Sequence, residues 1–330
     1  FTTPDELFDA LGLLEPTHIS TADYFKREKV NDRMAYDVVE AITHNMYNQG
    51  AQMNALASLV GLAGAGLAGG YLFVIDGGNW TLYDKMIKKA GLNLHEKTKV
   101  EKILISSQAQ GFPANAASAQ GSSAEAAQAT STQDSENHPS QSASLPYSFK
   151  LLLQNGETFN ADAVILAAPP ALADLSVELD GKPFNLVAHP YQEVQTTLVV
   201  GDLRPEYFGQ APGKQMPSTI FTAASAPAPF KSIGTTGWSP EYNNRIYKIF
   251  SADHVMTDEE LDAIFTKVLD KHVHVWRGAY PILTPNLKHL PFELSPGFYF
   301  ANALETVAGS IEVETVSGAN AANLCIDYLT

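Results

Sequence analysis

The sequence is poor in positive charge and in cysteine. Its 330 residues carry 21 lysines and arginines against 36 aspartates and glutamates, a formal net charge of −15. Because such a chain repels phosphate backbones, we expect no nucleic-acid partner. Cys325 is the only cysteine, which excludes an internal disulfide, a cysteine-based zinc site and a CxxC redox pair. His272 and His274 lack a third ligand, so the sequence predicts polar surface there and no metal site.

Targeting signals are also lacking. The chain begins Phe1-Thr2-Thr3-Pro4, without an initiator Met, a basic n-region or an apolar h-region. We therefore expect a mature product or a fragment of a longer chain.

The run from Ala41 to Ile75 contains no charged residue. Its second half is about 20 residues of apolar and small types, which is long enough to span a bilayer. The glycines between Gly61 and Gly70 would make one lipid-exposed helix hard to maintain. We favour a buried helix, a glycine loop and a buried strand up to Ile75, and we keep a membrane span as the alternative.

The same run contains a formal GxGxxG pattern from Gly64 to Gly69. A dinucleotide-binding fingerprint needs a strand before the glycines and a helix after them. Here the preceding residues favour a helix and the following ones a strand. The pattern therefore favours close backbone packing over a phosphate-binding loop.

Ser107 to Pro146 consists mostly of serine, alanine and glutamine. Such a segment cannot bury enough apolar surface to offset its ordering entropy, so we predict a disordered insertion. It lies between two predicted strands, 99–105 and 147–153. A turn at Asn155-Gly156 and a third strand, 161–168, follow. The insertion is thus expected at the tip of a hairpin, where long insertions cost little.

The remaining pattern mixes both element types, so the fold class is α/β or α+β, and we find no internal repeat. Strands are expected at 193–200, 245–251 and 297–303. Four helices are expected. The first runs from a cap at Asn31 or Asp32 to Gln49, and the second from Trp80 to Ala90, with Asn79 as its N-cap and Gly91 at its C-terminal end. The third runs from a Thr257–Glu260 capping box to about Lys271, and the fourth from about Val313 to Leu329.

Three segments in order resemble flavin-dependent oxidoreductases of the glutathione-reductase and amine-oxidase type. They are Val74–Asn79 with the helix and "TKVEKI" strand that follow, Asp162–Pro170, and Tyr299–Ala322. The resemblance implies that FAD is the cofactor. It implies that a carboxylate reaches the ribityl hydroxyls and that free amides of a helix N-terminus face the flavin N1/O2 edge. The residues implied to contact FAD are Gly77, Gly78, Asn79, Val100, Ala167, Ala168, Pro169, Asn302, Glu305, Glu312 and Val313.

A narrower resemblance covers nearly the whole chain outside the insertion. The segments that are similar to the prenylcysteine oxidase, or farnesylcysteine lyase, family are Asn45–Ala55, Gly61–Ala65, Asp76–Asn79, Thr196–Gly201, Tyr247–Ser251, Ala279–Pro281 and Asn302–Glu305. This implies oxidation of the thioether of S-farnesyl- or S-geranylgeranyl-cysteine by FAD and dioxygen. The implied products are cysteine, a prenyl aldehyde and hydrogen peroxide. A lysosomal or vacuolar location is expected from the resemblance alone, and membrane association is kept as an expectation from the apolar run.

The family resemblance also implies an incomplete FAD/NAD(P)-binding Rossmann-like domain of glutathione-reductase type, interleaved with a substrate domain. Family members open with a strand, a GxGxxG turn and a helix that bind the pyrophosphate. This unit is not present in residues 1–330, so we expect weak or no retention of FAD by them. The expected layout is substrate-domain helices at 1–73, FAD-domain elements at 74–106 and 147–175, the insertion at 107–146, the substrate domain at 176–292 and a C-terminal FAD-domain segment at 293–330.

Two other functions stay open. One is another FAD-dependent oxidase of the amine or carotenoid type. The other is a non-catalytic lipid-binding protein that uses the apolar run without a flavin. No residue is assigned as a catalytic acid or base, since hydride transfer to a flavin does not require one.

Overall fold

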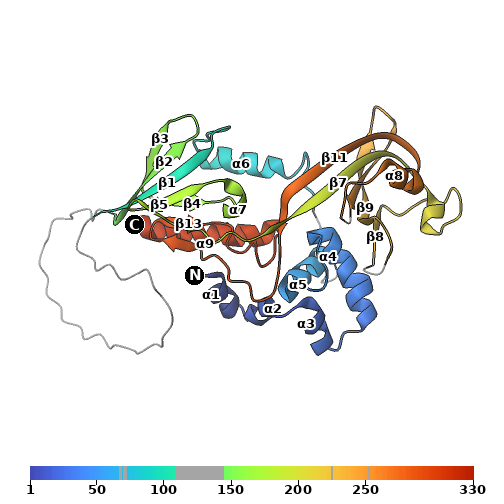
Figure 1. The fold of residues 1–330 in the computed structure, drawn as a ribbon, viewed down its shortest axis with the longest axis horizontal. Helices are drawn as coiled ribbons and strands as arrows, with labels where there is room; N and C mark the ends of the chain where they lie inside the picture. The colour runs from blue at the N-terminus through green and yellow to red at the C-terminus, as the bar shows by residue number, and fades with distance from the viewer. Residues whose placement is uncertain (67–68, 70–72, 109–144, 224–225, 252) are drawn as a thin grey trace, which may run out of the picture.

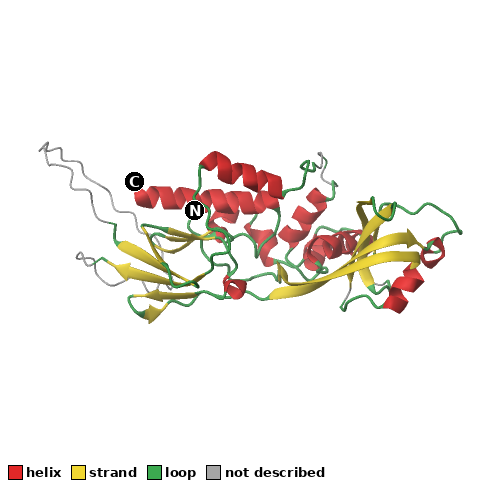
Figure 2. Ribbon diagram, turned by 90° about the horizontal axis from the view of Figure 1, so that it is seen from above, coloured by secondary structure: helices red, strands yellow, loops and turns green. Residues whose placement is uncertain are grey.

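The structure is a computed structural model that describes residues 1–66, 69, 73–108, 145–223, 226–251 and 253–330. Figure 1 shows an elongated molecule with sheet-containing lobes at its two ends and the N-terminal helices between and below them. The two long strands β7 and β11 run from the middle of the molecule into one lobe. The C-terminal helix α9 runs along the other lobe, as Figure 2 also shows.

The first lobe contains a five-stranded sheet in the order β3-β2-β1-β5-β6. Strands β1 and β2 form an antiparallel hairpin in which Ser107 lies opposite Tyr147. The expected insertion is therefore attached at the tip of this hairpin, and most of it lies outside the described residues. The strands are β1 (Val100–Ser107), β2 (Tyr147–Leu153), β3 (Thr158–Ala161), β5 (Ser176–Leu179) and β6 (Lys182–Pro183).

Strand β5 lies beyond the expected domain boundary at residue 175. It nevertheless pairs with β1 in parallel, and Ile103 lies opposite Val177. The chain therefore leaves the first lobe only after β6.

A second, three-stranded sheet lies in the same lobe in the order β12-β13-β4. It consists of β4 (Val164–Leu166), β12 (Glu293–Ser295) and β13 (Phe298–Phe300). The single strand expected over 161–168 is wrong, because the chain changes sheets between Ala161 and Val164. Ala161 pairs with Phe149 of β2, whereas Val164 pairs in parallel with Phe298 of β13.

The other lobe is built on an antiparallel sheet in the order β11-β7-β10-β9-β8. One face of this sheet forms an apolar core with Met256 and the short helix α8, where Ile249 and Ile264 are fully buried. The strands are β7 (Tyr191–Leu203), β8 (Thr219–Phe221), β9 (Phe230–Ser239), β10 (Asn244–Ser251) and β11 (Phe265–Pro281).

The helix expected to reach Lys271 is too long. Its Thr257–Glu260 capping box is present, but α8 ends at Ile264. Phe265 then takes an extended conformation, becomes almost fully buried and pairs with Leu203 of β7. Pairing with β7 and burial of this ring outweigh the local helical preference of the residues that follow.

The N-terminal helices pack around a buried α4–α5 pair. The Asn31 side chain accepts a hydrogen bond from the Arg33 amide at 2.9 Å and so caps the start of the helix that leads into α4, as expected. This helix contains a π-helical segment over Met34–Val39 and ends at Tyr47. The helices are α1 (Pro4–Ala10), α2 (Leu14–His18), α3 (Thr21–Arg27), α4 (Glu40–Tyr47), α5 (Ala55–Gly64), α6 (Trp80–Ala90), α7 (Pro170–Ala173), α8 (Asp258–Ile264), α9 (Ile311–Leu329) and the 3₁₀ turn Pro205–Phe208.

The charge-free run is only partly buried. Residues 41–43 of α4 and 55–58 of α5 are buried, as expected. Phe73 and Val74, which were expected in a buried strand, are 88% and 89% exposed and form no strand. Gly66 and Gly69 have positive φ in the loop after α5, so the GxGxxG pattern follows a helix. In the described part of the chain, no helix has the length and apolar character needed to cross a membrane.

Candidate functional site

The parallel pair β4–β13 brings two of the predicted segments together. Ala167, Ala168 and Pro169 follow β4 directly, and residues 301–302 follow β13. The strands are in register at Leu166 and Phe300, and the Ala301 amide donates to the Leu166 carbonyl at 2.8 Å. Both segments therefore leave the sheet at the same edge, where the ends of parallel strands commonly form ligand sites.

The chain then turns sharply into α9. The Glu305 amide donates to the Asn302 carbonyl at 3.1 Å. Ser310 caps the helix, because its hydroxyl accepts the Val313 amide at 3.2 Å. The Val313 amide was expected to face the flavin and is instead used by this cap. Among the described residues no acceptor takes the amides of Ile311 and Glu312, so these two donors are free at the positive end of the helix.

Two carboxyl groups lie at this turn. Glu305 accepts a hydrogen bond from the Tyr191 hydroxyl at 2.7 Å, and burial raises the pKa of Glu305. Burial, together with the charge of Glu305, raises the pKa of Glu314 to about 7. The Glu314 Oε1 atom is buried without a hydrogen-bond partner in the described structure. This arrangement presents carboxylate oxygens that can accept hydrogen bonds from a hydroxyl-rich ligand.

Sequence reasoning missed Tyr191 and Glu314. Tyr191 is far from Glu305 along the chain, and only the fold places β7 beside the turn. Glu314 follows the predicted Glu312 by two residues, which is about half a helical turn. Glu312 itself is exposed. The helical period could have shown that Glu312 and Glu314 lie on different faces of α9. However, α9 buries only Ser317 and Ala321, so its apolar residues do not indicate which face is the inner one.

Three further predicted residues share one core. Val100, at the start of β1, and Ala168 and Val313 are half-buried and pack against the same buried cluster as Phe298 and Leu304. The structure thus gathers the β1, β4 and α9 parts of the prediction in the first lobe.

The glycine segment before α6 is less closely attached. Gly77 and Gly78 have positive φ values of 85° and 96°, and the Gly78 amide donates to the Ile75 carbonyl at 2.8 Å, so they form a tight turn before α6. Helix α6 has the expected bounds and ends at Gly91 with φ 64°. The expected cap is wrong, because the Asn79 side chain makes no capping hydrogen bond. None of the hydrogen bonds between described residues joins Gly77, Gly78 or Asn79 to the turn at Glu305.

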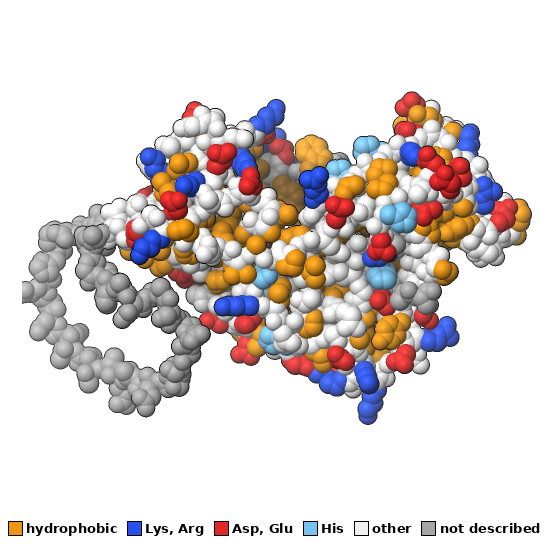
Figure 3. Space-filling view, viewed as in Figure 1, with side chains coloured by type: hydrophobic (Ala, Val, Ile, Leu, Met, Phe, Trp, Pro, Cys, Tyr) orange, Lys and Arg blue, Asp and Glu red, His pale blue; other side chains and the backbone are white. Residues whose placement is uncertain are grey.

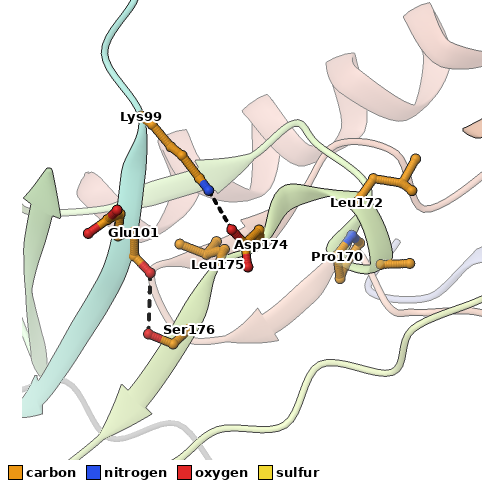
Figure 4. A pocket seen from close by; sticks show the side chains of 8 residues that line it. Lys99, Glu101, Pro170, Leu172, Asp174, Leu175 and Ser176 are labelled. Carbon is orange, nitrogen blue, oxygen red and sulfur yellow. Dashed lines mark hydrogen bonds and ion pairs between the residues drawn. The ribbon is translucent and has the colours of Figure 1, made fainter. Parts of the chain in front are cut away.

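A cavity of about 530 Å³ opens between the start of β1 and α7 (Figure 4). The Lys99 ammonium and Asp174 carboxylate form an ion pair across it at 2.6 Å, and the Ser176 hydroxyl donates to the Glu101 carbonyl at 3.2 Å. Val100 and Pro169, two predicted FAD contacts, adjoin residues that line this opening. Two of the predicted contacts therefore lie beside this surface opening, and none of the eleven lines it.

Solved structures define the class of the fold. The chain aligns with a wild-type putrescine oxidase solved with putrescine bound, at a TM-score of 0.53 and 12% identity, over 94% of this chain and 69% of that one. A double mutant of putrescine oxidase gives the same TM-score at 11% identity, over 95% and 69% of the two chains. The chain therefore has the mixed α/β fold of these oxidases.

Sequence comparison then gives the family. The profile of the prenylcysteine lyase family matches residues 1–330, so this chain belongs to that family. It is 25% identical to farnesylcysteine lyase of Arabidopsis thaliana over 96% of this chain and 54% of the relative. It is 24% identical to prenylcysteine oxidase 1-like of Bos taurus over 99% and 62% of the two chains. With prenylcysteine oxidase 1 of Bos taurus the identity is 23% over 96% and 57%. The chain thus spans somewhat more than half the length of these relatives.

Proposed function

We propose that this protein is an FAD-dependent oxidase that cleaves the thioether of S-farnesyl- or S-geranylgeranyl-cysteine. The family match over residues 1–330 carries the proposal. The fold shared with putrescine oxidase supports an oxidase framework. Dioxygen is the proposed second substrate, and hydrogen peroxide the proposed second product.

The C-terminal turn fits FAD. The free amides of Ile311 and Glu312 are suited to the negative charge that a reduced flavin carries near N1. The unpartnered Glu314 oxygen and the Glu305 carboxylate are suited to accept hydrogen bonds from the ribityl hydroxyls. Bound FAD would accept a hydride from the prenyl carbon next to sulfur and pass the electrons to dioxygen.

The protein side of the reaction is mainly positioning. Tyr191 holds the Glu305 side chain in one orientation through its hydroxyl. Small residues after β4, Ala167 and Ala168, leave room for a flat ring close to the backbone. The oxidised carbon then takes up water, and the resulting hemithioacetal separates into cysteine and a prenyl aldehyde. No side chain of this chain is assigned to proton transfer.

We also propose a lysosomal or vacuolar location, where prenylated proteins are degraded, and contact with membranes through which prenyl compounds reach the enzyme. The location rests on the family resemblance, and the membrane contact rests on the charge-free apolar run. Fractionation of cells that express the tagged full-length protein tests them.

The function is tested by product analysis. The full-length protein is supplied with FAD and S-farnesylcysteine in air, and free cysteine, farnesal and peroxide are measured. We expect equal amounts of the three products, and no peroxide from putrescine or a carotenoid. Peroxide from putrescine with none from S-farnesylcysteine would favour an amine oxidase. Binding of S-farnesylcysteine without any peroxide would favour a lipid-binding protein.

A further inference from the structure

A second cavity lies on the sheet of the other lobe, on the face opposite its apolar core. It measures about 550 Å³ and is lined by side chains of β7, β10 and β11. Lys248 and His272 both lie opposite Leu198, one from each neighbouring strand. Side chains directly opposite across strands are about 5 Å apart at Cβ, so this row places two basic groups on either side of an apolar one.

The next row has a buried hydroxyl at its centre, between an aromatic ring and an imidazole. Phe250 and His274 both lie opposite Thr196. Thr196 is 6% exposed, and its Oγ1 is buried without a hydrogen-bond partner in the described structure. A buried hydroxyl that lines a cavity and has no protein partner is suited to a polar ligand atom, since burial without a partner costs free energy.

Lys248 is the charged group of this cavity. It is half-buried, and its ammonium lies 4.6 Å from the centre of the Phe250 ring. Burial lowers the pKa of Lys248, and none of the described carboxylates forms an ion pair with it. No aspartate or glutamate is among the described residues that line the cavity. An anion placed here would therefore meet a cation that has no counter-ion among them.

The rest of the wall is apolar. Val194 is buried, and Trp276, opposite it on β11, is 51% exposed with its ring 4.1 Å from that of His274. Tyr280 also lines the cavity and packs edge-on against Tyr47, with ring centres 6.1 Å apart. In Figure 3, hydrophobic side chains also line a hollow between the two lobes. The cavity thus combines the ammonium group of Lys248 with a wall of apolar and aromatic side chains that suits a hydrocarbon chain.

We infer that this cavity binds an amphiphile with one carboxylate, which Lys248 pairs with, and an apolar tail that lies along Trp276, Phe250 and Tyr280. The net charge of −15 repels anions at long range, so this attraction has to be local. Two sources share this chemistry: the amino-acid end of an S-prenylcysteine and a fatty acid. The inference goes beyond the proposed function, because it requires binding and no oxidation.

The test measures binding of decanoate and decan-1-ol to the 330-residue chain by calorimetry. These ligands have tails of equal length and differ in charge. We expect decanoate to bind about tenfold more tightly than decanol, and Lys248→Met to abolish this preference. Lys267→Met is the matched control, because it removes the same charge from an exposed position of β11 outside the cavity. Circular dichroism and the melting temperature check that each variant is folded.

Location and source are tested in the same samples. Decanoate should change tryptophan fluorescence in the natural chain and not in Trp276→Phe. Competition by S-farnesylcysteine would identify the substrate as the source of the carboxylate, and lack of competition would identify a fatty acid. Equal binding of decanoate and decanol, or equal losses in Lys248→Met and Lys267→Met, would overturn the inference. Neither result depends on whether S-farnesylcysteine is oxidised, so the proposed function is tested separately.

Discussion

At the scale of single residues, the carboxyl groups of Glu305 and Glu314 are both half-buried, one in the turn before α9 and one in the first turn of that helix. Burial raises the pKa of both Glu305 and Glu314, and Glu305 raises that of Glu314 further. The Tyr191 hydroxyl partly offsets this effect for Glu305. Groups whose ionisation is shifted in this way often mark functional sites. Here they lie near the N-terminus of α9, where no described acceptor takes the amides of Ile311 and Glu312, and this turn is where we propose that FAD binds.

Glu314 gives a prediction for the pH dependence of stability. The unfolded chain ionises this group near its ordinary pKa of 4.5, and the folded chain near 7. The folded state therefore holds more protons between these values, and the free energy of unfolding falls as pH rises through this window. After allowance for partial exposure, the loss is at most about 2 kcal/mol. Glu314→Gln should remove it, as measured by urea unfolding at pH 5 and pH 8.

Glu312→Gln is the control for this experiment, because Glu312 is exposed on the same turn of α9. It should leave the pH dependence of the natural chain in place. An equal change in both variants would show that the burial of Glu314 is not the cause.

Tyr191 gives a second prediction. Tyr191→Phe removes the hydroxyl that donates to Glu305 and leaves this buried carboxylate with one donor fewer. The free energy of unfolding should fall by about 1–2 kcal/mol at neutral pH. Tyr36→Phe, at a position that is 43% exposed, should change it by less than about 0.5 kcal/mol. Similar losses in the two variants would contradict the role given to this hydrogen bond.

At the scale of elements, the long β7–β11 pair joins the two lobes, and its close packing depends on Gly201. A Cβ atom at this position would overlap the Lys267 carbonyl oxygen, which is held in the strand pair. At Gly237, in contrast, the nearest atom is Ile246 Cδ1 at 3.9 Å.

Gly201→Ala should therefore lower the free energy of unfolding by about 3 kcal/mol or more, because backbone has to move to admit the methyl group. Gly237→Ala should change it by less than about 1 kcal/mol. Thermal unfolding of the two variants measures the difference. If both tolerate alanine equally, the register of β7 and β11 near Gly201 is wrong.

Helix α6 differs from the other long helices in its packing. None of its residues is buried, and Trp80 and Met86 are 67% and 56% exposed. An 11-residue helix has little stability without tertiary packing. In hydrogen exchange of the 330-residue chain, its amides should exchange at least tenfold faster than those of α5, whose residues 55–58 are buried. Equal protection of α5 and α6 would contradict this view of α6.

The sequence predicted the elements that local chemistry determines. The structure confirms three features that depend only on neighbouring residues: the capping box at Thr257, the end of α6 at Gly91 and the bounds of α6. The end of α8 could not be predicted, because burial of Phe265 and its pairing with Leu203 depend on a distant strand. The division of 161–168 between two sheets has the same cause.

The candidate site was predictable to a similar extent. Ala168, Val313 and Glu305 were named from sequence, and the parallel β4–β13 pair brings their segments to one edge. Tyr191 and Glu314 required the fold, since only tertiary structure shows which side chains are buried beside Glu305. His272 and His274 were expected to be polar surface. Both are exposed, and they also line the cavity around Lys248.

At the scale of the whole molecule, the chain combines a lobe that carries the candidate cofactor site with a lobe that carries an apolar, cationic cavity. Strand β7 connects them: Tyr191 at its start bonds to Glu305, and Thr196 and Leu198 further along line the cavity. The same strand therefore contributes to the candidate cofactor site and to the cavity, and the inferred amphiphile would lie along it.

The proposed oxidase activity is tested by anaerobic mixing of the full-length, FAD-loaded protein with S-farnesylcysteine while the visible flavin absorbance is recorded. We expect the oxidised-flavin band to bleach with one equivalent of substrate, cysteine and farnesal to form in equal amounts, and air to restore the band. A flavin that stays oxidised when S-farnesylcysteine is bound would contradict it.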